Sequence, residues 1–189
     1  MGIEFELKFR ATEAALWEMR QHVAGTEKIF SMETTYYDAP DGSLSAKYYT
    51  LRRRMENNTS VCTLKTPAKG QGRNEFEVEC NCIEEAIPKL CKLSGENLPQ
   101  SVVPVCGAKF TRIAKTVVLT DCTVEVALDQ GVLSGGGREI PLCEAEVELK
   151  AGNLEGATAY AAQLAIAFNL TPETKSKFRR AKELAEAKL

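Results

Sequence analysis

The sequence has few of the side chains that usually bind transition metals. It contains one histidine, His22, and its seven cysteines form no CxxC pair. An odd number of cysteines without paired spacing argues against a disulfide framework, and the missing Cys/His cluster argues against a zinc site. We therefore expect a reduced, cytoplasmic protein in which His22 is structural or exposed.

The sequence also lacks an excess of one charge and any long apolar run. Its formal net charge is -2 although 26% of its residues are charged. We therefore expect no nucleic-acid partner, no membrane span and no signal peptide. An apolar content of 44%, with no low-complexity linker, favours a single domain over residues 1–189. The oligomeric state stays open between monomer and homodimer.

What the sequence does contain is rows of charged residues at every second position. Glu4, Glu6 and Lys8 alternate with apolar residues, and Glu144, Glu146 and Glu148 repeat the pattern near the other end. Alternate residues of an extended strand share one face, so each row predicts an ionic strand face. Two carboxylate rows indicate a metal ion or a cluster of cations.

The alternating segments and their turns predict an α+β fold built on an eight-stranded, antiparallel, closed β-barrel. The expected strands are residues 2–10, 33–38, 48–56, 60–66, 74–80, 109–119, 122–129 and 142–150. Helical spacing predicts several amphipathic helices that cover the barrel, at 12–24, 83–93, 156–168 and 173–188. Thr12 is the expected N-cap of the first helix, and Pro88 is expected to start or kink the second.

The ionic faces have two interpretations. For any one strand, the ordinary arrangement places apolar residues in the core and charged residues in water. Acids and bases are, however, segregated by strand, with glutamates on one and Arg52 with Arg54 on another, and they are not mixed as on a soluble surface. We therefore favour a barrel with a charged, water-filled lumen and helices on its apolar outside. Arginines suit phosphate oxygens and carboxylates suit Mg2+ or Mn2+, which together fit a metal-bound polyphosphate.

These residues, taken in order, resemble the CYTH superfamily, the triphosphate tunnel metalloenzymes. Glu4-Phe5-Glu6-Leu7-Lys8 is similar to its ExExK signature, and the likeness extends from residue 4 to about residue 180. The other matching motifs are Thr35–Leu44, Leu51–Arg54, Thr63–Lys65, Arg73–Glu77, Arg112, Val126–Asp129 and Cys143–Leu149. The resemblance is greatest to bacterial inorganic triphosphatases, and it implies an eight-stranded antiparallel tunnel.

The resemblance also implies roles for the charged residues. The phosphate oxygens would be bound by Lys8, Arg52, Arg54, Lys65, Arg73 and Arg112. Two Mg2+ or Mn2+ ions would be held by Glu4, Glu6, Glu144, Glu146 and Glu148. The candidate catalytic residues are Lys8, Glu77, Asp129 and Lys177. Lys177 is equally well interpreted as a solvated helix charge, and Lys115 is expected to point away from the tunnel, leaving Ala114 inside.

The activity that the resemblance implies is hydrolysis of inorganic triphosphate to pyrophosphate and phosphate. Such a reaction needs no protein nucleophile, because positioning and charge neutralisation supply most of the catalysis. The alternatives are a thiamine triphosphatase, an adenylate cyclase of the class IV type on the same tunnel, and a non-catalytic polyphosphate-binding module. The fold alone does not choose among them.

Overall fold

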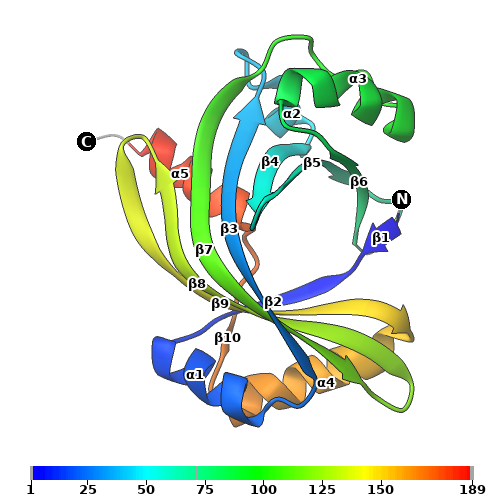
Figure 1. Cartoon of the computed structure of the whole chain (residues 1–189), viewed down its shortest axis with the longest axis vertical. Coiled ribbons are helices and arrows are strands. Elements are labelled where there is room, and N and C mark those ends of the chain that lie inside the picture. The colour runs from blue at the N-terminus through cyan, green and yellow to red at the C-terminus, as the bar shows by residue number, and fades with distance from the viewer. Residues whose placement is uncertain (1, 71, 188–189) are drawn as a thin grey trace.

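The computed structural model describes residues 2–70 and 72–187, with only the backbone described at residues 2 and 3 (Figure 1). The predicted helix 173–188 and the predicted domain 1–189 therefore reach beyond the described residues. The elements in order are β1 (Gly2–Glu4), β2 (Glu6–Arg10), α1 (Glu13–His22), β3 (Thr26–Asp38), α2 (Ser43–Ala46), β4 (Thr50–Glu56), β5 (Thr59–Pro67), β6 (Arg73–Glu79), α3 (Ile83–Ser94), β7 (Val103–Val118), β8 (Cys122–Gly135), β9 (Arg138–Gly152), α4 (Leu154–Ala167), β10 (Thr171–Pro172) and α5 (Lys177–Glu186).

The strands form one strongly curved antiparallel sheet, but the prediction of eight strands in a closed barrel is wrong. The described residues give ten hydrogen-bonded segments in the order β1-β6-β5-β4-β3-β7-β8-β9-β2-β10. Counting β1 and β2 as one strand interrupted at Phe5 gives nine. β1 pairs with β6 and β2 pairs with β9, so the N-terminal segment crosses between the two sides of the sheet without a continuous ladder. The α+β class and the helical cover are confirmed.

One apolar cluster joins the outer faces of β8 and β9 to α1 and α4. Val126 and Val147 of the sheet are buried against Met19 of α1 and Ala161 of α4, and all four are at most 2% exposed. The first helix begins where predicted, because the Thr12 side chain accepts a hydrogen bond from the backbone N–H of Ala15 at 3.1 Å. Helices therefore cover the apolar side of the sheet and leave its ionic side facing inward.

A second cluster lies under α3, on the outer faces of β4, β5 and β6. Leu51 and Leu64 of the strands pack with Leu90 of the helix, and all three are fully buried. The sequence predicted that this helix starts near Pro88 or is kinked there, and the predicted start is wrong. The helix begins at Ile83 and Pro88 lies inside it, because the apolar face of the segment is buried against the sheet on both sides of the proline.

The last helix, α5, differs from the others because it packs on the inner face of the sheet. Phe178 and Ala181 join Tyr36 and Phe110 in a third cluster, and Tyr36 and Phe178 also line the central pocket. Gly135 permits the close approach, since a Cβ there would lie 2.3 Å from the carbonyl oxygen of Ala181. The helix therefore forms one wall of the interior.

The observed elements extend the predicted ones at several ends. The predicted strand 33–38 is the second half of β3, and β7, β8 and β9 also exceed their predicted ranges. The short α2 and the two-residue β10 were not predicted. None of the helices in the described part of the chain has the length and apolarity needed to cross a membrane.

Truncation of a buried leucine tests the packing of α3. Leu90→Ala is expected to lower the free energy of unfolding by about 2 to 5 kcal/mol, because Leu90 is fully buried. Urea denaturation followed by circular dichroism measures the change. The matched control is Leu93→Ala on the same helix, where the side chain is 51% exposed and a change of about 0.5 kcal/mol or less is expected. Equal losses in both variants would contradict the packing.

Candidate functional site

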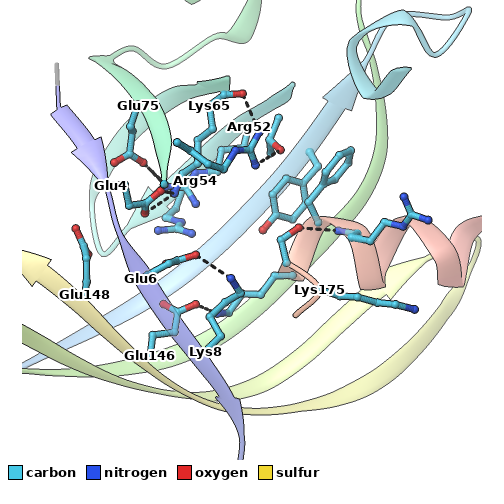
Figure 2. A pocket seen from close by; sticks show the side chains of 18 of the residues that line it. Glu4, Glu6, Lys8, Arg52, Arg54, Lys65, Glu75, Glu146, Glu148 and Lys175 are labelled. Carbon is cyan, nitrogen blue, oxygen red and sulfur yellow. Dashed lines mark hydrogen bonds and ion pairs between the residues drawn. The ribbon is translucent and has the colours of Figure 1, made fainter. Parts of the chain in front are cut away.

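A pocket of about 1120 Å³ lies inside the curved sheet and is lined mainly by charged side chains (Figure 2). Most of the predicted site residues lie on its wall. These are Glu4, Glu6, Lys8, Arg52, Arg54, Lys65, Arg73, Glu77, Arg112, Glu146, Glu148 and Lys177. Asp129 and Glu144 do not line the pocket, because they are completely buried behind it. The strands thus bring ionic residues from distant parts of the sequence into one enclosure.

One side of the pocket carries carboxylates from the N-terminal segment and β9. Glu6 lies opposite Glu148 in the β2–β9 ladder, and Glu125 of β8 lies opposite Glu148 on its other side. Burial, together with the neighbouring carboxylates Glu4 and Glu125, raises the pKa of Glu148 although Lys150 opposes the change. A buried carboxylate with other acids beside it favours binding of a cation.

Another part of the wall carries three arginines that have few acidic partners. Arg54 donates to Thr34 Oγ1 at 3.1 Å, and Glu56, the acid paired with it, is 3.6 Å away. Within the described part of the chain, Arg73 donates only to uncharged oxygens, at Thr50 Oγ1 and at two backbone carbonyls. Arg52 Nε is buried and has no hydrogen-bond partner among the described residues.

The surroundings shift the pKa values of these guanidinium groups in different directions. Although burial works against the charge, Tyr36 and the acids Glu75, Glu4 and Glu77 raise the pKa of Arg52. Burial and the neighbouring charges of Arg52 and Arg112 lower the pKa of Arg54 to about 10. Burial also lowers the pKa of Arg73. Buried cations in excess over their acidic neighbours form a site of positive potential, which suits an anion with several oxygens.

The two predicted lysines of the strands are paired more closely with acids. Lys65 Nζ lies 2.5 Å from the Glu4 carboxylate and 3.1 Å from Glu75, which is its direct neighbour in the β5–β6 ladder. Lys8 Nζ lies 3.3 Å from Glu6 (Figure 2). The lysines thus lie at the boundary between the acidic side and the arginines.

A cluster of three carboxylates, which we call the buried triad, consists of Glu146 on the pocket wall and Asp129 and Glu144 behind it. Their oxygens lie within 4.8 Å of one another, close enough to hold a metal ion. Arg112 donates to both oxygens of Asp129 at 2.7 Å and to Glu146 at 2.5 Å. Lys177 Nζ lies 2.8 Å from Asp129 and 2.6 Å from Glu146, and it also donates to Glu144. Lys177 therefore lies among the triad and is not a solvated helix charge.

Sequence reasoning missed several charged neighbours of the site. Lys150 contacts Glu148 at 2.9 Å, and Arg180 of α5 donates to Glu144. Arg180 also approaches Glu173, which is 1% exposed. Lys177 and Arg180 are three residues apart, so helical spacing could have indicated that both face the same surface.

Two residues considered from the sequence lie outside the pocket wall. Lys115 is buried, and its ammonium donates to the carbonyl oxygens of Arg20 and Val23 at the end of α1, so it points away from the pocket as predicted. His22 is exposed, and its Nδ1 lies 2.9 Å from the carbonyl oxygen of Glu18. Neither residue lines the pocket.

Comparison with known protein families shows to which family this chain belongs. The family model described as the CYTH domain matches residues 2–181. The chain belongs to the CYTH family. A curated CYTH relative is the inorganic triphosphatase of Haemophilus influenzae, which is 34% identical over 164 residues. That match covers 80% of this chain and 46% of the relative, so the chain spans about half the length of the curated relative it matches.

Solved structures show the same fold at low sequence identity. A candidate adenylyl cyclase from Hippeastrum, described as having a dominant triphosphatase activity, superposes with a TM-score of 0.67 at 16% identity and covers 99% of this chain and 97% of its own. A candidate adenylate cyclase from Bacillus halodurans gives a TM-score of 0.60 at 15% identity, with coverage of 94% and 96%. Both likenesses show that this chain shares the fold of these two proteins.

Removal of Arg112 tests the buried triad as a charge-balanced unit. Arg112→Met is expected to lower the free energy of unfolding by about 3 to 5 kcal/mol, because it leaves the three triad carboxylates with two cations, Lys177 and Arg180. Urea denaturation measures the change. The control is Arg179→Met, whose side chain is 65% exposed and pairs with Glu183, and its expected effect is below about 0.5 kcal/mol. A mild effect of the Arg112 substitution would contradict the buried network.

Proposed function

We propose that this protein hydrolyses inorganic triphosphate to pyrophosphate and phosphate. The observation that carries the proposal is the group of three arginines on the pocket wall, Arg52, Arg54 and Arg73. The carboxylates nearest to Arg52 and Arg54 are 3.6 Å away, beyond hydrogen-bond distance, and Arg73 has no ion pair among the described residues. A polyphosphate would neutralise these cations with its oxygens, and guanidinium groups match phosphate geometry. The curated relative named as an inorganic triphosphatase supports the same activity.

The acidic side of the pocket suits divalent metal, and we propose two Mg2+ or Mn2+ ions. Glu4, Glu6 and Glu148 would hold them, because these carboxylates line the pocket and the pKa of Glu148 is raised by burial and by Glu4. Glu146 lies at the border of this group and the buried triad. When bound, the metal would neutralise phosphate charge and favour ionisation of the attacking water.

The side chains would act mainly by position. Arg52, Arg54 and Arg73 would hold the phosphate oxygens from one side, with Lys8 and Lys65 beside the acids. The water oxygen bonds to the terminal phosphorus and loses a proton to solvent, the bond from that phosphorus to the bridging oxygen breaks, and pyrophosphate leaves with the electron pair of that bond. Charge neutralisation in a preformed site is the main catalytic requirement of this reaction.

Two of the predicted catalytic residues are better placed to support arginines. Glu77 accepts a hydrogen bond from Thr63 Oγ1 at 3.0 Å and lies 3.9 Å from Arg52. Asp129 is fully buried behind the wall, where it binds Arg112 through both oxygens. We propose that Glu77 and Asp129 orient these arginines and do not contact water at the reacting phosphorus.

Several wider expectations stay proposals. We propose that residues 1–189 form one CYTH domain with triphosphate as its small-molecule substrate. The cytoplasmic location and the choice between monomer and homodimer stay predictions of the sequence.

Identification of the products tests the activity. The purified protein is incubated with tripolyphosphate, thiamine triphosphate or ATP, plus Mg2+ or Mn2+, and phosphate, pyrophosphate and cyclic AMP are resolved. The proposal expects phosphate and pyrophosphate, fastest with tripolyphosphate. Cyclic AMP as the main product, or no turnover of any triphosphate, would overturn it.

A neutral substitution on the acidic side tests the metal requirement. Glu6→Gln is expected to lower metal-dependent turnover by about 100-fold or more, because the amide cannot replace a charged ligand. Turnover is measured across a metal titration, and circular dichroism checks that the fold is intact. The control is Glu155→Gln on the exposed surface of α4. Wild-type turnover by the Glu6 variant would show that the metal assignment is wrong.

Substitution of Arg54 separates ligand binding from stability. Arg54→Gln is expected to weaken metal-free tripolyphosphate binding by about 2 kcal/mol, or about 30-fold in Kd. It should not destabilise the unliganded fold, since burial and like charges already disfavour the Arg54 cation. Calorimetric titration and thermal unfolding measure the two effects, with Arg20→Gln on α1 as the control. Unchanged binding would exclude Arg54 as a phosphate contact.

A further inference from the structure

Two acid pairs face each other across β8 and β9, and only one of them is neutralised inside the protein. Asp129 lies directly opposite Glu144, and Glu125 lies directly opposite Glu148. Like charges in directly opposed positions destabilise a sheet unless cations accompany them. The pair at Glu148 has one lysine nearby, Lys150, whose side chain is 42% exposed. The pair at Glu144 is surrounded by buried cations.

The cations around the buried triad match it in number and use its oxygens. One oxygen of Glu144 accepts from Lys177 and the other from Arg180. Both oxygens of Asp129 accept from Arg112. Three carboxylates thus meet three cations, Lys177, Arg112 and Arg180, and Asp129 and Glu144 are completely buried. A metal ion at this place would have to displace an ammonium group that is already bound.

The ammonium of Lys177 is committed to the triad. It has three N–H groups, and it contacts one oxygen each of Asp129, Glu144 and Glu146. It also lies 5.5 Å from the centre of the Phe110 ring. Although burial works against the charge, the three carboxylates raise the pKa of Lys177. Its hydrogen bonds go to Glu144 and Glu146, and its contact with Asp129 is an ion pair, so the ammonium is held by protein acids.

We propose that the buried triad is a socket for Lys177 that anchors α5 against the sheet, and that Glu144 is a positioning residue and not a metal ligand. Other contacts of the same helix continue the attachment. Arg180 approaches buried Glu173, and Lys182 lies 3.2 Å from Asp38. The socket fixes the first turn of α5, which forms part of the pocket wall, while divalent ions bind at Glu4, Glu6 and Glu148. The assignment of metal ions to Glu4, Glu6 and Glu148 rests on the proposed function, whereas the anchoring of α5 by Lys177 does not.

Direct Mn2+ binding without any phosphate tests the assignment. Electron paramagnetic resonance is used to titrate Mn2+ into the wild type, Glu6→Gln and Glu144→Gln, with Glu155→Gln as a surface control. We expect Glu6→Gln to lose about 10-fold or more in affinity, and Glu144→Gln to bind as the wild type does. A comparable loss in Glu144→Gln would overturn the proposal.

Hydrogen exchange tests the anchoring in the same samples. In Glu144→Gln the amides of 177–186 should exchange faster, while those of α1 at 13–22 keep their wild-type rates. Unchanged exchange in α5 would overturn the socket. If Glu6→Gln also binds Mn2+ normally, the metal set of the proposed function is wrong, and the exchange result still decides the socket.

A double variant keeps the test decisive if a single substitution impairs folding. Glu144→Gln leaves two acids with three bases, and Lys177→Met leaves three acids with two bases, whereas the combination leaves two of each. The double variant should therefore be less destabilised than the sum of the single losses measured by urea denaturation. It should also retain wild-type Mn2+ affinity. Strictly additive losses, or weakened Mn2+ binding by the double variant, would contradict a Glu144–Lys177 partnership.

Discussion

The interior of this protein depends on the neutralisation of carboxylates that the sheet forces together. The register of β8 and β9 places Asp129 against Glu144 and Glu125 against Glu148. Neither pair can reach solvent by a one-residue shift in strand register, because the shift would also move the apolar residues of both strands away from α1 and α4. The cost of gathering these charges is offset where cations reach them. The positions of Arg112 and Lys177 follow from that requirement.

The same constraint divides the pocket into regions with different chemistry. Near the buried triad, acids and bases are equal in number and closely bonded, so this part acts as structure. On the acidic side, carboxylates outnumber their partners, and around Arg54 the cations outnumber theirs. One wall of the cavity therefore has excess negative charge and another has excess positive charge. A bound complex of metal and polyphosphate would neutralise both, with the metal at the carboxylates and the phosphates at the arginines.

The sequence predicted well those features that depend on strand periodicity. Alternation placed Glu4, Glu6, Arg52, Arg54 and Glu148 on ionic strand faces, the segregation of acids from bases favoured turning those faces inward, and all five residues line the pocket. Periodicity says which face a residue occupies but not which strand lies beside it. It could not show that the first strand is interrupted at Phe5, nor that the sheet remains open. The first half of β3, residues 26–32, has three consecutive polar residues followed by the adjacent apolar residues Ile29 and Phe30, so it gave no regular alternation to reveal its length.

The partners of each site residue were harder to predict than the residues themselves. Glu144 and Glu148 look equivalent in the sequence, since both belong to the same alternating row. Their surroundings differ because α5 docks beside Glu144 and brings Lys177 and Arg180 with it. Helix docking depends on tertiary features such as the close approach at Gly135, which no local pattern encodes. Family resemblance suggested Lys177 as a site residue but not its commitment to three acids.

The pairing of the N-terminal segment has a consequence for biosynthesis. Glu6 and Lys8 lie beside Glu148 and Glu146, which the ribosome adds about 140 residues later. β1, by contrast, pairs with β6, which is available much earlier. During synthesis, β1 can therefore pair with β6 before β9 exists, whereas β2 stays without its β9 partner until β9 has been made. Contacts of such long sequence separation form late in folding, so the pocket can assemble only after most of the polypeptide has left the ribosomal exit tunnel.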